Sequence, residues 1–148
     1  MHNKTILFFG GTGSLGNNFI ARNSENNTII NYSRDECKHW HLEMKYGVKV
    51  KNVLGDIRDK ERVKNTLVKY NPHIVIIASA LKHIDKVEYA IGESIKTNIM
   101  GINNILSSID EINSNNMETV LFVSTDKACS PINVYGICKA LAEKLLLS

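Results

Sequence analysis

A chain of 148 residues, 43% of them hydrophobic, is long enough to bury one sizeable core. Its net charge of +3 is spread along the sequence, and no apolar run reaches membrane-spanning length, which argues against a nucleic-acid surface and a membrane protein. Residues 1–4 are too short and polar for a signal peptide, and the 3 cysteines lack metal-ligand spacing. We therefore expect a cytoplasmic domain over residues 1–148 with no metal site.

A predicted strand and a glycine-rich turn come first. Residues 5–9 form a short apolar run, and Gly10-Gly-Thr-Gly13-Ser-Leu-Gly16 follows it directly. Glycines at this spacing allow a tight turn and a close approach of backbone to a pyrophosphate, which the N–H groups of the following helix attract. An ordinary glycine-rich turn is the alternative. We predict that a dinucleotide binds at this turn, against Gly10, Thr12, Gly13, Ser14, Leu15 and Gly16.

The second predicted strand, residues 28–32, is followed by Ser33-Arg-Asp-Glu-Cys-Lys38. A carboxylate at the end of this strand would bind a ribose 2′-hydroxyl, whereas an arginine accommodates a 2′-phosphate. Ser33, Arg34 and Lys38 supply a hydroxyl and two cations, so the pattern favours NADP over NAD. In the alternative, Asp35 and Glu36 only favour the start of a helix while the cations are solvated.

The rest of the chain continues to alternate between strands and helices. Further strands are predicted over residues 48–53, 74–78 and 119–123, and helices over about 36–46, 60–70, 87–112 and from 132 to the end. This alternation predicts a Rossmann-type, doubly wound α/β fold with a parallel sheet of central strand order 3-2-1-4-5. Ligands should then bind at the carboxyl ends of the strands.

Other candidate residues fall at such strand ends. Asp56, with Ile57 beside it, follows the third strand and could accept a hydrogen bond from an adenine amino group or cap the next helix. Ala78 is small and leaves room beside a cofactor. Lys82 could contact a phosphate-bearing substrate, although a surface lysine is the default, and we expect His83 to be structural or solvent-facing.

The most informative motif is Ser124-Thr-Asp-Lys127 followed by Tyr135-x-x-x-Lys139. Tyr135 and Lys139 stand one helical turn apart on the same face, so the ammonium can stabilise a phenolate and lower the tyrosine pKa from about 10. Such a tyrosine is a base able to remove a hydroxyl proton while hydride leaves the same carbon. Tyr-x-x-x-Lys alone is a weak signal, and the glycine turn upstream gives it its weight.

Together these motifs resemble the extended short-chain dehydrogenase/reductases, and more narrowly the inverting UDP-N-acetylglucosamine 4,6-dehydratases and related polysaccharide-biosynthesis dehydratases. The resemblance also rests on Gly55-Asp-Ile-Arg-Asp59, Ala80-Leu-Lys-His83 and Lys96-Thr-Asn-Ile-Met-Gly101. Its most specific element is Asp126-Lys127, because retaining sugar-nucleotide dehydratases carry Asp-Glu there. Full-length members continue for about another domain, so the resemblance implies an NADP-binding part that lacks the C-terminal strands and substrate domain.

The resemblance also implies a role for each residue of the motif, with a UDP-sugar as substrate. Tyr135 removes the proton of the sugar 4-hydroxyl as hydride passes to NADP⁺, Thr125 shares that hydrogen bond, and Lys139 holds the tyrosine and the nicotinamide ribose. Lys127 then takes the C5 proton and Asp126 protonates the departing 6-hydroxyl. Both must be neutral to do so, which a dry site favours.

Two other functions stay open: a catalytically silent dinucleotide-binding module, and a 4-epimerase-like enzyme, in which Lys127 has no obvious use. Family members commonly pair through the long helices, here residues 87–112 and 132–147. The resemblance therefore implies a homo-oligomer, or else a complementing C-terminal polypeptide. Without further strands, the strand at 119–123 should lie at an open edge of the sheet.

Overall fold

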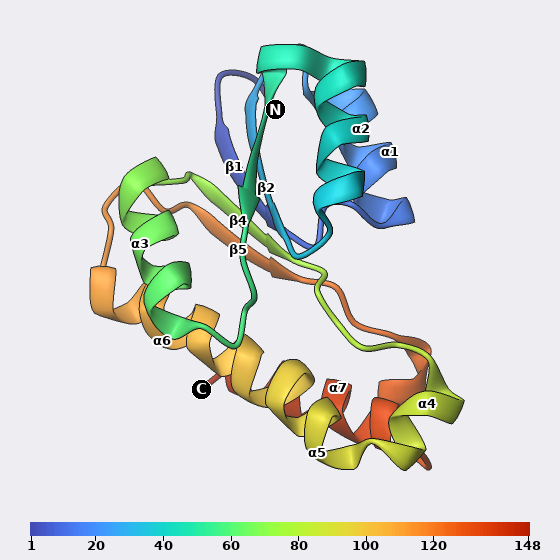
Figure 1. The fold of residues 1–148 in the computed structure, drawn as a ribbon. Helices are drawn as coiled ribbons and strands as arrows, with labels where there is room; N and C mark the ends of the chain where they lie inside the picture. Colours follow the sequence, from blue (N-terminus) through green and yellow to red (C-terminus); the bar gives the residue numbers. More distant parts are fainter.

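A five-stranded parallel sheet forms the centre of the computed structural model, which describes residues 1–148 (Figure 1). The strands lie in the order β3-β2-β1-β4-β5, which confirms the predicted Rossmann-type topology. Their bounds are β1 Thr5–Phe9, β2 Thr28–Ser33, β3 Val50–Leu54, β4 Ile74–Ile77 and β5 Thr119–Phe122. All strands therefore end at the same side of the sheet.

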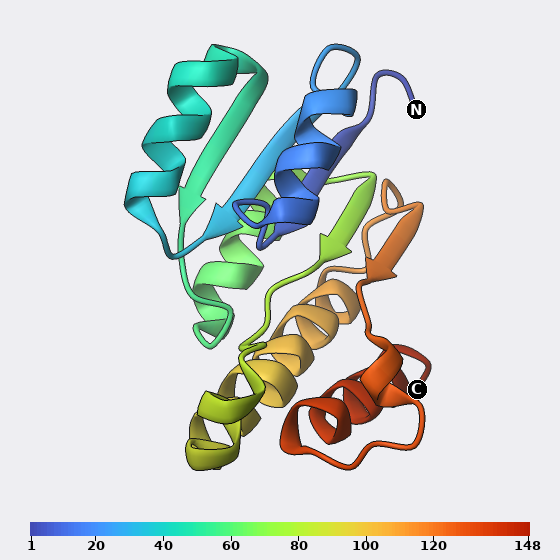
Figure 2. The same ribbon diagram turned by 90° about the vertical axis from the view of Figure 1, so that its right-hand side faces the viewer.

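Helices cover the sheet on both faces. Helices α1 and α2 lie on one face, and α3, α6 and α7 lie on the other (Figures 1 and 2). The helix bounds are α1 Ser14–Asn23, α2 Glu36–Tyr46, α3 Lys60–Tyr70, α4 Ile84–Tyr89, α5 Ile91–Ser94, α6 Ile102–Ile112 and α7 Val134–Leu146. None of these helices has both the length and the apolar character that crossing a bilayer requires.

The two faces follow from the alternation of side chains along each strand. On β1, Leu7 and Phe9 belong to the large core cluster with α3, α6 and α7, whereas Ile6 and Phe8 face the opposite side. All four side chains are fully buried. A strand buried on both faces is hydrophobic at successive positions, which is why residues 5–9 form a continuous apolar run.

The predicted helix over residues 87–112 is not continuous in the structure. It is divided into α4, α5, a π-helical segment Ile95–Gly101, and α6. Ala90, with φ −126° and ψ 51°, separates α4 from α5. At the other end of the π-helical segment, Gly101 lies so close to Ile57 that an added Cβ would be 2.7 Å from its Cδ1. The helix is therefore broken at Ala90, while Gly101 allows the continuous stretch after the break to pack closely against Ile57.

The boundaries of two other elements also differ from prediction, for local reasons. Gly47, at φ +55°, starts a 3₁₀ turn, Gly47–Lys49, so β3 begins at Val50 rather than at residue 48. Helix α7 begins at Val134 rather than at residue 132 because Asn133 is its N-cap and accepts a hydrogen bond from Gly136 N at 2.8 Å.

Strand β5 lies at an edge of the sheet, and Figure 2 shows its carboxyl end leading toward α7. Its side chains alternate between half-buried and exposed, with Val120 and Phe122 packed against the large core cluster. On the opposite face Leu121 is 47% exposed. This edge is the least covered part of the sheet.

Candidate functional site

A cleft of about 320 Å³ opens at the carboxyl ends of β1 to β4. Its wall contains most of the residues that the sequence analysis assigned to a cofactor, and also Lys82, which is exposed. Those residues are Gly10, Thr12, Gly13, Ser33, Arg34, Lys38, Asp56, Ile57 and Ala78. Ser14, Leu15 and Gly16 form the first turn of α1 outside this wall, and Tyr135 and Lys139 lie on α7. The fold thus brings the strand-end motifs together, while their roles stay predictions.

The glycine turn is packed tightly on one side and open on the other. Gly10 has φ +88°, and an added Cβ there would be 2.8 Å from Ser79 N. At Gly16, an added Cβ would overlap the backbone of Gly11. At Gly13 it would meet only Gly10 O, at 3.6 Å, and no side chain caps α1. The first N–H groups of the helix are therefore available to an anion, so the turn fits a pyrophosphate.

Asp56 is held by cations rather than used as a helix cap. Arg58 donates to its carboxylate from Nε at 2.9 Å, Nη2 at 2.7 Å and the backbone N at 3.0 Å. Burial would raise the pKa of Asp56, but the hydrogen bonds from Arg58 outweigh it and hold this pKa below its usual value. The alternative reading of Asp56 as the cap of α3 is wrong, because the N-cap is Asp59, which accepts from Arg62 N.

The two cations predicted to bind a 2′-phosphate both have acidic neighbours. Arg34 Nη1 is 3.6 Å from Asp56 Oδ2, and Lys38 Nζ is 3.3 Å from Asp35 Oδ2. Asp35 is also the N-cap of α2 and accepts from Lys38 N. Both cations remain more than half exposed. They can therefore exchange these weak surface pairs for an anionic ligand.

Several side chains that shape the cleft carry no sequence signal of their own. Tyr32 is fully buried and donates from its hydroxyl to Asp56 O at 2.9 Å, which fixes the ends of β2 and β3 together. Asn98 accepts from Leu81 N at 2.8 Å and donates to Leu81 O at 2.9 Å, so it clamps the loop after β4. Asn98 lies in Lys96-Thr-Asn-Ile-Met-Gly101, the one motif that could have indicated it.

The Ser124–Lys139 segment, meaning residues 124–139, contains the predicted chemical residues. Thr125 Oγ1 donates to Asp126 Oδ1 at 3.0 Å, and Lys127 Nζ is 3.4 Å from the same oxygen. The Asp126 side chain is 87% exposed and that of Lys127 is 43% exposed. Hydrogen bonds from Thr125 and Lys127 lower the pKa of Asp126. In this chain the pair is therefore a charged, solvated ion pair, not the neutral, dry pair that the predicted chemistry requires.

Lys139 is directed at the backbone and not at Tyr135. Its Nζ donates to Val123 O at 2.7 Å and lies 4.4 Å from the ring centroid of Phe122. The residue is only 3% exposed, and burial lowers its pKa to about 8 while Glu143 opposes the shift. No hydrogen bond joins it to Tyr135, because the buried ammonium needs a partner and the carbonyl at the end of β5 supplies one.

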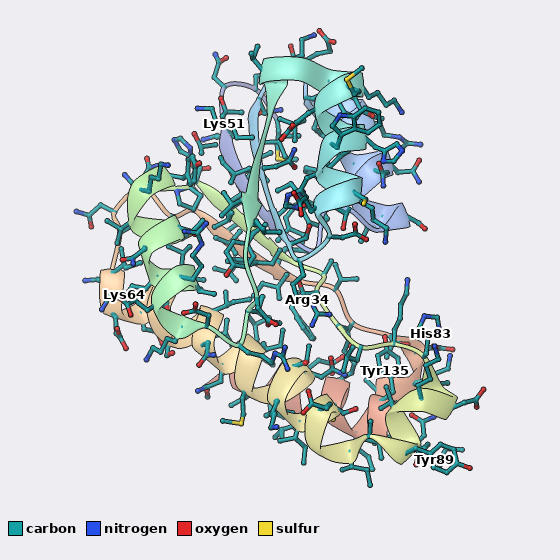
Figure 3. The ribbon with its side chains drawn as sticks, in the orientation of Figure 1. Arg34, Lys51, Lys64, His83, Tyr89 and Tyr135 are labelled. Atoms are coloured by element: carbon teal, nitrogen blue, oxygen red, sulfur yellow. The ribbon has the colours of Figure 1, made fainter.

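The start of α7 lies directly against the loop that follows β5. At Gly136 an added Cβ would overlap Lys127 O, so Gly136 allows the loop and the helix to approach. Ser124 donates from its hydroxyl to Glu143, which ties the start of the segment to α7. Figure 3 labels Tyr135 and Arg34 on the same side of the molecule, the side where the strands end. Asp126, Lys127 and Tyr135 are thus held near one another at that end of the sheet.

A parallel sheet of this order, with a glycine turn after β1 and Tyr-x-x-x-Lys on α7, defines a Rossmann-type fold of the extended short-chain dehydrogenase/reductases. Residues 6–148 match the family described as "Polysaccharide biosynthesis protein". The chain belongs to this family.

Its relatives include enzymes of two related activities. The inverting UDP-N-acetylglucosamine 4,6-dehydratase of Campylobacter jejuni is 38% identical over 149 residues, covering 98% of this chain and 43% of that protein. The UDP-glucose 4-epimerase of Rickettsia prowazekii is 36% identical over 152 residues, with the same coverage of 98% and 43%. The chain therefore spans less than half the length of these relatives.

Solved structures share the fold. Pen from Bacillus thuringiensis superposes with a TM-score of 0.89 at 29% identity, over 97% of this chain and 44% of that one. UDP-glucose 4-epimerase from Brucella ovis, solved in complex with NAD, gives 0.83 at 21% identity, over 97% and 47%. At the lower identity the likeness establishes the fold alone.

Proposed function

We propose that this chain is the cofactor-binding and catalytic part of an NADP-dependent nucleotide-sugar 4,6-dehydratase that acts on UDP-N-acetylglucosamine. The observation that carries the proposal is the Asp126-Lys127 pair. It lies beside the first turn of α7, which carries Tyr135, at the same end of the sheet as the cleft. The 38% identity to a dehydratase of this type supports it further.

The cleft has parts that suit each portion of a dinucleotide. The turn Gly10–Gly16 and the free start of α1 suit the pyrophosphate, and Asp56 suits the adenine amino group. Arg34 and Lys38 lie where a ribose 2′-phosphate would be bound. Bound NADP⁺ would accept a hydride from the sugar and return it. NADP is favoured over NAD because Asp35, the nearest carboxylate after β2, is already used by the cap of α2.

A matched pair of arginine variants tests the cofactor preference. Arg34→Ser should weaken NADP⁺ binding about tenfold or more, because a charged hydrogen bond to the 2′-phosphate is lost, and leave NAD⁺ binding nearly unchanged. Arg22→Ser is the control, since Arg22 is exposed in the last turn of α1, away from the cleft wall. Titration calorimetry with both dinucleotides gives the ratio of NADP⁺ to NAD⁺ affinity for each protein. Tighter NAD⁺ than NADP⁺ binding by the unmodified chain would contradict the NADP assignment.

The proposed chemistry needs a change of protonation in the segment. Tyr135 takes the proton of the 4-hydroxyl, and Thr125, in the loop after β5, shares that hydrogen bond. Lys139 follows Tyr135 by one turn of α7, and to support the tyrosine its ammonium would have to leave Val123 O. The resulting 4-ketone acidifies C5–H, Lys127 removes that proton, and Asp126 protonates the leaving 6-hydroxyl. Moving one proton from Lys127 to Asp126 makes both neutral, and a bound sugar nucleotide that excludes water from the exposed pair would favour that transfer.

Two further readings rest on specific observations. The exposure of Asp126 and Lys127 favours a dinucleotide-binding module without turnover, since this chain alone leaves the pair in water. The 36% identity to UDP-glucose 4-epimerases favours an epimerase-like reaction, in which Lys127 has no evident task.

These three readings are distinguished by incubating the chain with UDP-N-acetylglucosamine and NADP⁺ and measuring how much of the sugar nucleotide is consumed. A 4-keto-6-deoxy product supports the dehydratase, and a 4-epimer of the sugar nucleotide supports the epimerase-like enzyme. Cofactor binding without turnover supports the silent module. If product forms, Lys127→Ala should abolish it and leave cofactor affinity unchanged. Lys51→Ala, at an exposed position on β3, is the control. Full turnover by Lys127→Ala would remove the assignment.

Helix α7 also supports a proposed self-association. Ile137 is 52% exposed and Leu141 is 45% exposed, one turn apart on α7, whereas Ala142 is fully buried in the core. We expect a homo-oligomer through this face or a complementing polypeptide that covers it. Analytical ultracentrifugation of the chain and of Leu141→Glu tests this. A dimer that becomes a monomer in Leu141→Glu would support the interface, whereas a monomeric wild-type chain would contradict self-association.

A further inference from the structure

A partly buried hydrogen bond joins Ser33 to His39 at the edge of the cleft. Ser33 is the last residue of β2 and lines the cleft together with Arg34 and Lys38. Ser33 Oγ is 2.6 Å from Nε2 of His39, which lies in α2 and is only 6% exposed. None of the roles proposed above uses His39. Its ring nevertheless has one hydrogen-bond partner, Ser33, and that residue lines the cleft.

The direction of this hydrogen bond decides what Ser33 offers to a ligand. If the Ser33 hydroxyl donates to Nε2, only the lone pairs of its oxygen face the cleft. If Nε2–H donates to Ser33 Oγ, the hydroxyl hydrogen is free to turn toward the cleft. A ribose 2′-hydroxyl can donate or accept and fits either arrangement. A 2′-phosphate dianion has only acceptors and fits only the second.

We propose that His39 is a positioning residue that favours a nucleoside 2′-phosphate, because its Nε2–H donates to Ser33 and turns the Ser33 hydroxyl hydrogen toward the phosphate. The inference rests on the proposed binding of a dinucleotide in this cleft and adds the source of its 2′-phosphate preference. His39 does not line the cleft and acts only through Ser33. Arg34 and Lys38 supply the charge, and the His39–Ser33 pair supplies an oriented donor.

The surroundings of His39 tie this orientation to pH. Burial lowers the pKa of His39, while the carboxylates of Glu43, Asp35 and Glu36 oppose the shift. These carboxylates belong to α2 and to its cap. The ring is therefore neutral in the free chain near pH 7.5, and both directions of the hydrogen bond are open to it.

The other elements that contact His39 add no charge of their own. From β2 its partner is Ser33, and from β3 it is Asn52, whose Nδ2 donates to His39 O at 3.2 Å. The nearby cations Lys38 and Arg34 are paired with Asp35 and Asp56. A protonated imidazole can only donate, so protonation fixes the outward direction of the Ser33 hydroxyl. A bound phosphate would stabilise that imidazolium, so NADP⁺ binding should take up a proton.

Titration of the chain with NADP⁺ and NAD⁺ between pH 6 and 8 tests the inference. His39→Ala should weaken NADP⁺ binding about tenfold at pH 6.5 and change NAD⁺ binding less than about twofold. His39→Gln, whose side-chain amide can still donate to Ser33, should keep most of the NADP⁺ affinity but lose part of its rise as pH falls. The 2′-phosphate titrates near pH 6 in every variant, so only the difference between variants reports on His39.

Two controls separate positioning from folding. His41→Ala removes an exposed histidine from the same helix and should leave both affinities unchanged. In a Ser33→Ala background, His39→Ala should have no further effect on the ratio of NADP⁺ to NAD⁺ affinity, because its target is gone. In nuclear magnetic resonance spectra, the His39 ring signal, identified by its absence from His39→Gln, should titrate at a higher pH with NADP⁺ than with NAD⁺.

The outcomes distinguish this inference from the proposed function. If wild type binds NADP⁺ and the affinity ratio is unchanged in His39→Ala, or if both affinities fall equally, the inference is overturned while the cofactor site stands. If wild type binds neither dinucleotide, the cofactor site and the inference fall together.

Discussion

The cleft and the Ser124–Lys139 segment are both built at the carboxyl ends of parallel strands, yet this chain completes them to different degrees. In the cleft, Asp56 is paired with Arg34 from the end of β2 as well as with Arg58, and Ser33 is bonded to His39 of α2. In the segment, Asp126 is bonded only to its immediate neighbours Thr125 and Lys127.

Strand position explains this difference. The cleft lies among the loops that follow four adjacent strands, β1 to β4, whereas the segment follows β5 alone at one edge of the sheet. A site over the middle of a sheet can be closed by the loops of several strands. A loop after an edge strand is covered from one side only. Helix α7 provides that one side, and Lys139 is the charged residue of the segment that is buried there.

The largest effect should come from filling the glycine turn. Gly16→Ala would force a Cβ into the Gly11 backbone, so we expect it to lower the free energy of unfolding by about 3 kcal/mol and to abolish dinucleotide binding. Gly92→Ala, in α5, places its Cβ in open space and should raise stability by about 0.5 kcal/mol. Urea unfolding measures both. Equal effects would show that the turn is less tightly packed than the structure indicates.

Lys139 tests whether the segment has a buried, charged component. Because its pKa of about 8 in the folded chain lies below the 10.5 of an unperturbed lysine, protonation favours the unfolded state. Stability is therefore full above about 10.5 and is lost as pH falls through 8. Wild type should gain about 2 kcal/mol between pH 8 and pH 10, and Lys139→Met should lack that gain.

Urea titrations at both pH values measure this gain. Lys144→Met, at an exposed position of the same helix, should keep the wild-type behaviour. Ionisation of tyrosines near pH 10 affects all three proteins, so only their difference is diagnostic. The same pH dependence in Lys139→Met and wild type would contradict the burial of the ammonium.

A moderate effect is expected where the cleft holds its own carboxylate. Asp56→Asn replaces a carboxylate that accepts three hydrogen bonds from Arg58, so the free energy of unfolding should fall by about 1 kcal/mol at pH 7. Because the pKa of Asp56 lies below its usual 3.8, this contribution is present above that pH and is lost as the pH falls further. Urea unfolding at pH 7 and pH 3 should show the difference shrinking. If wild type and Asp56→Asn differ in stability by the same amount at both pH values, the loss comes from altered packing and not from the charge of Asp56.

The smallest effect on stability is expected for Asp126, the aspartate of the segment that is compared with Asp56 of the cleft. Asp126→Asn alters an exposed ion pair, so the urea midpoint at pH 7 should not change measurably. If the dehydratase proposal is right, the same variant should nevertheless lose most of its turnover, since Asp126 is the proposed acid. A stability loss as large as that of Asp56→Asn would remove the contrast between the two regions.

The sequence by itself determined the fold and the place of the site. The apolar run at residues 5–9, the glycines at 10, 13 and 16, and the alternation of strands and helices are local signals. Right-handed crossovers leave few ways to order such strands, so the topology followed from those signals. Because parallel strands end on one side of a sheet, the cleft at the ends of β1 to β4 followed as well.

Only the tertiary structure decided which groups become partners. Lys139 bonds to Val123 O instead of Tyr135, Asp59 rather than Asp56 caps α3, and His39 reaches Ser33. The helix predicted over residues 87–112 breaks at Ala90, and the close approach of Gly101 to Ile57 is likewise set by the fold. Hydrogen bonds and burial depend on which groups the folded chain brings within about 3 Å, and on which of them water can still reach. Spacing along the chain records neither distance nor access to water, so these choices are absent from the sequence pattern.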